Sequence, residues 1–348
     1  NNYLGLANHP HVKARVKAAI DKYGIGVGGP PLLNGYNKLI EEAEERLAAL
    51  KFQEDALLYS SGFMANLGVV SALTQPNDVI LYDELSHASF FDGIKQTKAK
   101  AVQFAHNNLS NLEIILQNFC DCSGTLFVCV EGVYSMDGNL APLRQISQLC
   151  KTYGAILMVD DAHGTGVLGK GGSGTGSHFN CSQDIDLTMG TFSKVFAVCG
   201  AFLAGNKDLI HYLRFHSRQY IFSASIPPTV TAAVLGGLDV VEKEPWLRTT
   251  LLENAKYAIE KLSRFAFCAK PEAAIIALQL PDRMDIRKAS LAFHQLNIFI
   301  NPIEYPAVAT NRQRFRISLM ATHTKEDIDC LADAVEEVWN TSSVYNPA

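Results

Sequence analysis

The amino-acid sequence predicts an α/β protein with a mostly parallel, doubly wound sheet in a large domain and a smaller α+β domain at the C-terminus. The chain has 348 residues, of which 48% are hydrophobic, so it can bury one large core and a smaller companion. Short runs rich in strand-forming residues alternate with amphipathic segments over most of the chain. After residue 227 a long helical stretch leads into a second set of strands and helices.

The first two thirds of the chain carry the alternation of strands and helices. Helical spacing is seen at His11–Tyr23 and again at Lys38–Leu50, whose glutamates are expected to face solvent. The runs predicted as strands are Ala56–Tyr59, Val79–Tyr82, Ala101–Phe104, Thr125–Val130, Ile156–Val159, Leu187–Met189 and Ala201–Ala204. Helices are predicted between most of them, at Gly62–Leu73, Leu109–Phe119 and Leu143–Tyr153. Alternation of this kind favours a parallel sheet with helices on both faces.

The last third of the chain has a different pattern. Helical spacing continues through Val230–Val241 and Leu247–Leu262, and the end of the chain reads as a strand at Arg314–Leu319 and a helix at Lys325–Trp339. We therefore predict three parts, which are an N-terminal arm (residues 1–35), a large domain (36–239) and a small C-terminal domain (240–348). Asn1 reads as the middle of a structured unit, so we expect that part of the protein precedes it.

Composition excludes several classes of protein. The net charge of −5 and the pI near 6.1, without a basic run, argue against nucleic-acid binding. The eight cysteines lack Cys-x-x-Cys spacing and are expected to be reduced thiols in a cytoplasmic protein. The ten histidines offer no set of ligands for a metal, and no apolar run is long enough to cross a membrane.

Two glycine-rich motifs are not interpreted as nucleotide sites. Gly24–Gly29 matches Gly-x-Gly-x-x-Gly, but a predicted helix precedes it and two prolines follow, whereas a dinucleotide site needs a strand before and a helix after. Gly164–Lys170 follows a predicted strand and resembles a P-loop. Gly171 stands where the P-loop needs serine or threonine, and the glycines after it are poor residues to begin a helix.

Polar residues follow four of the predicted strands. His87, Ser135, Asp160, His163 and Lys194 all lie just beyond strand ends. In doubly wound sheets ligands bind at the carboxyl ends of the strands, so these five side chains are expected at one edge.

Lys194 is the most informative of these residues. Taken alone it would be an ordinary surface lysine, Asp160 a helix cap and His163 a core histidine. Apolar residues flank Lys194 on both sides, however, and desolvation would lower its pKa and free the amine to form a Schiff base. A lysine for an aldehyde, a carboxylate for a ring nitrogen and a phosphate cradle are what pyridoxal 5'-phosphate (PLP) requires.

Five segments, in order, are similar to motifs of a known enzyme family. They are Asn1–Leu6, Leu85–Ser89, Glu131–Gly138, Asp160–Gly164 and Gly190–Lys194. On these motifs the chain resembles the α-oxoamine synthases, which are PLP-dependent transferases of fold type I, from Asn1 to about Val338. The resemblance implies that residues 36–239 bind PLP and that residues 1–35 contribute to a subunit interface.

The resemblance also implies roles around the cofactor ring. Lys194 would hold the cofactor and later remove the α-proton of the substrate, and Asp160 would pair with the ring nitrogen. His87 would stack on the ring face, while Ser135 and His163 would bond near the ring oxygen. Lys194, His87, Asp160 and His163 are therefore the candidate catalytic residues.

A second set of residues is implied for the phosphate. Gly62 and Phe63 would offer backbone N–H groups at a helix start, and Thr191 would add a hydroxyl. Ser223 or Ser225 would reach the phosphate held by a partner subunit, because family members are homodimers with active sites at the interface.

The implied reaction joins an amino acid to an acyl thioester, carried by CoA or by acyl carrier protein, with loss of carbon dioxide. Arg316 would grip the substrate carboxylate with Asn1 nearby, since a planar guanidinium suits a carboxylate. The chain departs from the usual family pattern at Pro30, Pro31 and Ile40, which places the choice of acyl donor and the dimer contacts in doubt.

The sequence signals for the branch of the family conflict. Similarity to serine palmitoyltransferase-like members is found at Leu33–Gly35, Phe215–Ser225, Ile298–Pro302 and Met320–Thr324. Similarity to oxononanoate synthases is found at Phe104–Asn108 and Asp160–Gly166. We favour a longer acyl chain with serine, alanine or glycine, and keep 8-amino-7-oxononanoate synthesis and glycine C-acetyl transfer as alternatives. An aminotransferase of the same fold and a non-catalytic subunit also stay open, although Lys194 argues against the latter.

Overall fold

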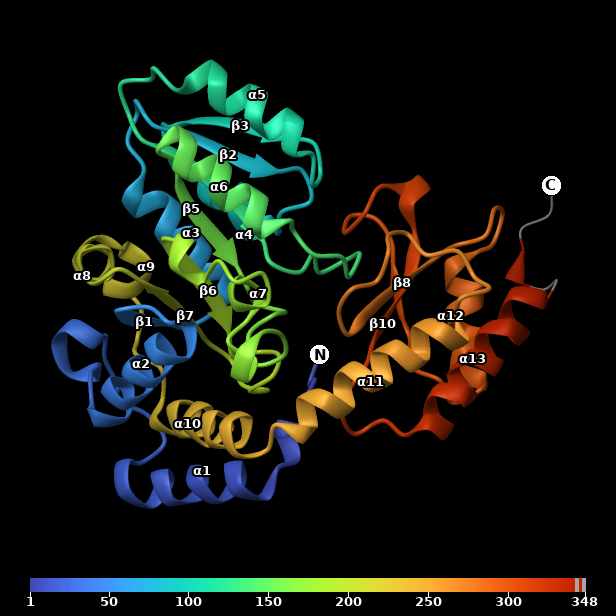
Figure 1. Cartoon of the computed structure of the whole chain (residues 1–348). Coiled ribbons are helices and arrows are strands. Elements are labelled where there is room, and N and C mark those ends of the chain that lie inside the picture. The colour runs from blue at the N-terminus through green and yellow to red at the C-terminus, as the bar shows by residue number, and fades with distance from the viewer. Residues whose placement is uncertain (342–343, 346–348) are drawn as a thin grey trace.

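The computed structural model describes residues 1–341 and 344–345 and has a large α/β part and a smaller C-terminal part (Figure 1). The strands of the large sheet are β1 (Asp55–Tyr59), β2 (Val79–Asp83), β3 (Lys100–Phe104), β4 (Leu126–Glu131), β5 (Ile156–Asp160), β6 (Leu187–Thr191) and β7 (Ala201–Gly205). Their order is β1-β7-β6-β5-β4-β2-β3, and only β7 runs antiparallel to its neighbours. The predicted mostly parallel sheet, with all its predicted strands, is confirmed.

Helices cover both faces of this sheet. They are α1 (Pro10–Tyr23), α2 (Lys38–Lys51), α3 (Gly62–Leu73), α4 (Ala88–Ile94), α5 (Leu109–Phe119), α6 (Leu143–Tyr153), α7 (Thr175–His178), α8 (Lys207–His216), α9 (Arg218–Ile221) and α10 (Pro228–Lys243). Side chains alternate along β1, so Leu57 and Tyr59 join the core under α3 and α8. Ala56 and Leu58 join the opposite core, which contains residues of α2 and α10. Burial on both faces explains the nearly continuous apolar runs of the strands.

Helix α2 begins where the local sequence predicts, but one of its glutamates is not exposed to solvent as expected. The Asn37 side chain caps its start by accepting from the N–H groups of Leu39 and Ile40. Glu44, expected in solvent, is buried and accepts hydrogen bonds from Tyr36 and from Arg214 of α8. The helix packs against β1 and β7 on that side, so burial of the carboxylate is compensated by a guanidinium from a distant helix.

The smaller part consists of a three-stranded antiparallel sheet and three helices. Its elements are α11 (Trp246–Lys261), β8 (Ile275–Gln279), α12 (Ile286–Gln295), β9 (Asn301–Ile303), β10 (Arg314–Ser318) and α13 (Lys325–Asn340), with the sheet order β8-β10-β9. Helix α13 begins with a capping box between Thr324 and Asp327. In Figure 1, α11 leads from α10 into this part, and α1 lies along α10. The domain boundaries at residues 35 and 239 stay a prediction.

The rejected glycine motifs have no nucleotide-site geometry. Helix α1 precedes Gly24, and after Gly164 the chain makes turns and the four-residue helix α7. Gly174 has φ +104°, and a Cβ there would lie 1.7 Å from an Asp161 carboxylate oxygen, so only glycine fits. Within residues 1–341 and 344–345, we find no cluster of three or more potential metal ligands, and no helix long and apolar enough to cross a membrane.

Candidate active site

The carboxyl ends of four neighbouring strands place the predicted polar residues along one edge of the large sheet. His87 follows β2, Ser135 follows β4, Asp160 ends β5 and Lys194 follows β6. In the ladder, Asp160 stands opposite Glu131 of β4 on one side and Met189 of β6 on the other. The edge therefore brings together side chains that lie more than a hundred residues apart in the sequence.

Asp160 is a buried carboxylate whose acceptors are met by amide donors. Asn66 Nδ2 donates to Oδ2 at 2.8 Å, and the Ala162 N–H donates to Oδ1 at 3.1 Å. Burial raises the pKa of Asp160, while these donors and the nearby side chains of His87 and Lys194 oppose the rise. A carboxylate in this setting can accept a further hydrogen bond from a charged donor, such as the protonated ring nitrogen of a ligand.

Lys194 lies beside this carboxylate with its amine uncommitted. Burial lowers its pKa, the nearby carboxyl groups of Asp160 and Glu131 oppose the shift, and Arg316 lowers the pKa further. No carboxylate of the described residues lies within 4 Å of the amine. An amine with a lowered pKa and no ion pair is suited to form a Schiff base.

His163 is held by a residue that the sequence analysis did not select. Its Nδ1 lies 2.7 Å from the hydroxyl of Tyr3, and both side chains are buried. Burial lowers the pKa of His163 well below its usual range, and the nearby charges of Lys194 and Arg316 add to the effect, so the ring is neutral. Tyr3 belongs to the N-terminal motif from which only Asn1 had been chosen, so the signal that points to it was in the sequence.

Arg316 of β10 reaches the same place from the smaller part. Its guanidinium donates to the backbone oxygen of Ser135 at 2.5 Å, to Ser318 Oγ at 2.8 Å and to Asn1 Oδ1 at 3.2 Å. All three acceptors are neutral, and no described carboxylate pairs with Arg316, whereas the neighbouring Arg314 is paired with Asp137. Its positive charge is therefore available for the carboxylate of a substrate.

The start of α3 provides a place for an anion. Ser61 caps the helix through the Met64 N–H, which leaves the N–H groups of Gly62 and Phe63 without partners inside the helix. A Cβ added to Gly62 would lie 3.6 Å from Thr191 Cβ, so the end of β6 faces this helix start. The hydroxyls of Thr191 and Ser193 lie 2.9 Å apart and enlarge the polar surface. These groups fit a phosphate, and Ser193 is a second residue that the sequence analysis missed.

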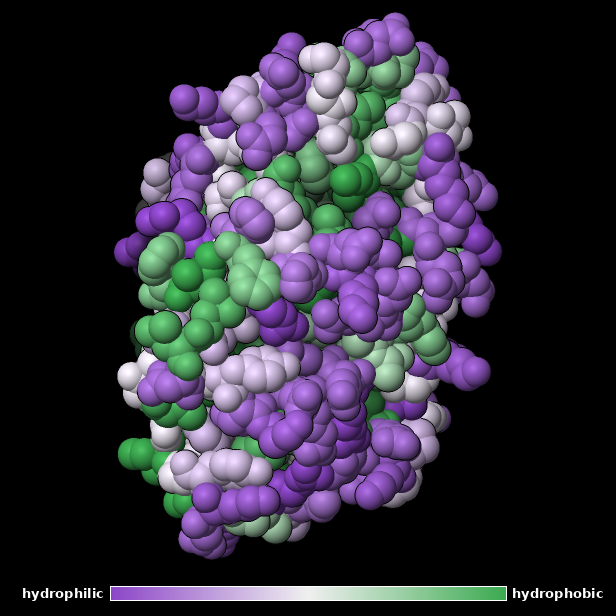
Figure 2. Space-filling model, turned by 90° about the vertical axis from the view of Figure 1, so that its left-hand side faces the viewer, coloured by the Kyte–Doolittle hydropathy of each residue, from purple (hydrophilic) through white to green (hydrophobic). Residues whose placement is uncertain are grey.

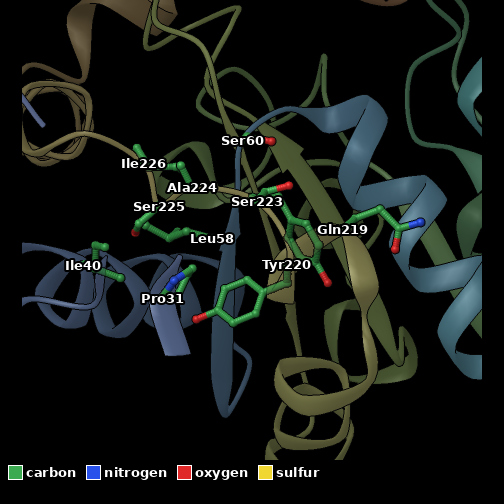
Figure 3. Close-up of a pocket in the computed structure, with 11 residues that line it drawn as sticks. Pro31, Ile40, Leu58, Ser60, Gln219, Tyr220, Ser223, Ala224, Ser225 and Ile226 are labelled. Atoms are coloured by element: carbon green, nitrogen blue, oxygen red, sulfur yellow. The ribbon is translucent and has the colours of Figure 1, made fainter. Parts of the chain in front are cut away.

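Ser223 and Ser225 lie in a different place from the other candidates. They line a small pocket with Ser60 and with Pro31 and Ile40, two of the departures from the family pattern (Figure 3). The Ser225 N–H donates to the Gly29 oxygen at 3.0 Å, which ties the segment to the N-terminal arm. The structure brings these serines together with the unusual residues.

A cavity of about 1110 Å³ opens between the large and small parts beside His87 and Ser135. Its walls include Leu85, Phe91 and Met136 from the large part. The other wall comes from the small part, and it includes Leu280, Tyr305, Val308 and Arg312. Apolar and polar residues line the cavity in similar numbers, and it is large enough for an extended substrate.

Comparisons with known proteins agree with this geometry. The model of class I and II aminotransferases matches residues 1–335. An 8-amino-7-oxononanoate synthase of Thermoanaerobacter pseudethanolicus is 39% identical over 339 residues, which are 97% of this chain and 86% of that protein. A serine palmitoyltransferase of Bacteriovorax stolpii is 37% identical over 349 residues, 99% of this chain and 83% of its own.

The chain belongs to the α-oxoamine synthase family. Solved structures support the same assignment, and they confirm the expected fold type I. Serine palmitoyltransferase from S. paucimobilis, with bound PLP and myriocin, superimposes with a TM-score of 0.93 at 31% identity and covers 97% of this chain and 85% of that one. An 8-amino-7-oxononanoate synthase from Francisella tularensis gives a TM-score of 0.83 at 26% identity, covering 97% of both chains. This α-oxoamine synthase is thus a PLP-dependent acyltransferase, and the expected cofactor and reaction type are confirmed.

Proposed function

We propose that this α-oxoamine synthase condenses serine, alanine or glycine with a long-chain acyl thioester, in the manner of a serine palmitoyltransferase. The observation that carries the proposal is the meeting of a free lysine amine, a buried carboxylate and an unpaired arginine at the sheet edge where His87 and Ser135 line a large cavity. Bound PLP would make the α-carbon of the amino acid acidic and able to attack a thioester. Carbon dioxide and the thiol leave, and an α-amino ketone results.

Asp160 and its neighbours would fix the cofactor ring. The carboxylate would accept from the ring nitrogen and keep it protonated. His87 would cover one face, and Ser135 and the neutral His163 would bond near the ring oxygen. The N–H groups of Gly62 and Phe63 and the Thr191 hydroxyl would hold the phosphate.

Lys194 and Arg316 would act on the amino acid. Arg316 would hold its carboxylate in a planar pair, with Asn1 beside it. The Lys194 Nζ would remove the α-proton of the amino acid. A lowered pKa keeps part of the lysine in the neutral form that this step needs.

The size and lining of the cavity support a long acyl chain. Leu85, Phe91, Met136 and Leu280 offer apolar contact to an alkyl chain. A thioester of CoA or of acyl carrier protein would reach the site through this opening.

The close alternative is 8-amino-7-oxononanoate synthesis from alanine and a pimeloyl thioester. Two relatives with that name are 39% and 40% identical to this chain, and the serine palmitoyltransferase of B. stolpii is 37% identical. Arg312 in the cavity wall would suit an acyl chain that ends in a carboxylate. For glycine C-acetyl transfer, the short acetyl group would fill the smallest part of the cavity.

The test is a substrate matrix with the PLP-loaded enzyme. Glycine, alanine and serine would each be combined with acetyl, pimeloyl and palmitoyl thioesters of CoA and of acyl carrier protein, and products identified by mass spectrometry. We expect product and carbon dioxide with palmitoyl thioester. Product with pimeloyl and alanine alone would establish the alternative, and conversion of the cofactor to its amine form by an amino acid alone would indicate an aminotransferase.

We also propose that the enzyme is a homodimer with its active sites at the subunit interface. Figure 2 shows hydrophobic side chains gathered on the face of the large part that points away from the small part. Leu33, Ile25 and Phe222 are 82%, 78% and 71% exposed in the single chain. A dimer would allow Ser223 or Ser225 to reach the phosphate of the partner subunit. Sedimentation velocity tests this, and Phe222→Glu should weaken the dimer.

A cytoplasmic location also stays a prediction. All eight cysteines are free, as is usual where thiols are kept reduced.

A further inference from the structure

A chain of buried hydrogen bonds connects Asp160 to His87. Asn66 of α3 donates through Nδ2 to Asp160 Oδ2 at 2.8 Å and to Ser89 Oγ at 2.9 Å. Ser89 Oγ in turn lies 2.8 Å from His87 Nδ1. The side chains of Asn66 and Ser89 are both completely buried, and neither was selected from the sequence.

The chemistry of these groups fixes the direction of every bond in the chain. The Asp160 carboxylate accepts only, so the amide nitrogen of Asn66, and not its oxygen, must face it. The second N–H of the same amide goes to Ser89 Oγ, which directs the serine O–H toward His87 Nδ1. The Ser89 backbone N–H also points at Nδ1, at 3.3 Å. With two donors aimed at it, Nδ1 carries no proton and the neutral ring holds its proton on Nε2.

The arrangement leaves one buried atom without a partner. Asn66 Oδ1 has no hydrogen-bond partner among the described residues. A buried unpaired amide oxygen lowers stability. The amide of Asn66 bears this cost while its nitrogen donates to Asp160 and to Ser89.

We propose that Asn66 is a positioning residue that, through Ser89, couples the ring-nitrogen partner Asp160 to the ring-stacking His87 and fixes the His87 proton on Nε2. The proposal rests on the proposed function, because it takes the roles of Asp160 and His87 in holding PLP from there. Asp160 at the edge of the cofactor ring and His87 on its face would then be connected by one chain of hydrogen bonds. Residues that orient a ligand-binding side chain through a hydrogen bond typically change affinity by roughly 10-fold or more when they are lost.

The experiment compares Asn66→Ala and Ser89→Ala with wild type in the full chain. Ring nitrogen chemical shifts of ¹⁵N-labelled histidine report the tautomer of His87, and the signal is assigned by its absence in His87→Gln. PLP affinity is measured in parallel by fluorescence titration. The matched control is Asn254→Ala, since Asn254 is a buried asparagine that also donates two hydrogen bonds, to the oxygens of Met320 and His323.

We expect wild type to show Nε2–H at His87 and both site variants to show a mixture of tautomers, with PLP affinity reduced roughly 10-fold. Asn254→Ala should change neither quantity. An unchanged His87 tautomer in both Asn66→Ala and Ser89→Ala would overturn the proposal. If Asn66→Ala does not fold, Ser89→Ala alone decides. Failure of the proposed function would look different, because wild type would then give no product in the substrate matrix, although its PLP affinity and the His87 tautomer could still be measured.

Discussion

Two aspartates that are adjacent in sequence, Asp160 and Asp161, meet lysines in opposite ways. Asp161 is paired with Lys51 at 2.6 Å, and both side chains are only 2% exposed. Thr175 donates to Asp161 through its hydroxyl at 2.6 Å and through its N–H, and Lys51 also donates to the Ser173 oxygen at 2.9 Å. Both charged groups are bonded to partners within the fold, so we call this pair closed.

The pair formed by Asp160 and Lys194 is open by contrast. Asp160 accepts from the amides of Asn66 and Ala162, and no ion pair joins it to Lys194. Both groups face the edge of the sheet where a ligand can enter. Burial of a lysine near an aspartate therefore does not by itself indicate a functional site. The functional pair differs in that its amine and carboxylate can still bond to a ligand.

The largest expected effect comes from removing the amine of the open pair. Lys194→Ala should lower the rate of condensation by at least about 10³-fold, because the amine proposed to hold the cofactor and to remove the proton is lost. Its free energy of unfolding should change by less than about 1 kcal/mol, since no ion pair is broken. Product formation and urea denaturation check the two parts. A variant that keeps its activity would refute the assignment.

Removing the amine of the closed pair should act on stability. Lys51→Met leaves the Asp161 carboxylate buried without its cation, and the free energy of unfolding should fall by about 3–5 kcal/mol. Urea denaturation measures this fall, and adding Asp161→Asn should recover part of it because the uncompensated charge is removed. A loss below about 1 kcal/mol would show that the pair is not needed to hold the loop.

Glu131, whose carboxyl group lies near Asp160 and Lys194, is expected to make the stability of the protein depend on pH. Burial first, and then the charge of Asp160, raise the pKa of Glu131 well above its usual range. The folded protein therefore keeps a proton that the unfolded chain releases above about pH 4.3, and the free energy of unfolding falls as pH rises above that value. Glu131→Gln should remove this fall between about pH 5 and pH 8. Denaturation of both proteins across this range is the measurement, and identical slopes would contradict it.

The smallest expected effect concerns a donor of the closed pair. Thr175→Val removes the hydroxyl bond to Asp161 and keeps the backbone bond, so it should cost about 1–2 kcal/mol of stability. PLP affinity should stay unchanged, because Asp160 is untouched. A loss of PLP affinity without a loss of stability would mean that the two aspartates are not separate in function.

The sequence predicted the sheet and the open pair because both depend on local signals. Strand patterns were clear, and a polar residue after a strand end lies at a known edge. The closed pair could not be predicted, since Lys51 ends a helix 110 residues before Asp161 and reads as a surface residue. For the same reason Glu44 was wrongly placed in solvent, because its partner Arg214 comes from a distant helix.

The supporting residues of the site were missed for a related reason. Asn66 and Ser89 lie inside or at the start of helices, where the sequence gives no sign that their polar groups turn toward the sheet. Their role depends on how α3 and α4 pack together, which is a property of the tertiary structure.

The most direct test of this account is to reduce the PLP-loaded protein with borohydride and to locate the modified lysine by peptide mass spectrometry. We expect one pyridoxyl group per chain, on Lys194, and no modification of Lys51. Modification at another lysine, or none, would contradict the claim that the open pair is where this enzyme holds its cofactor.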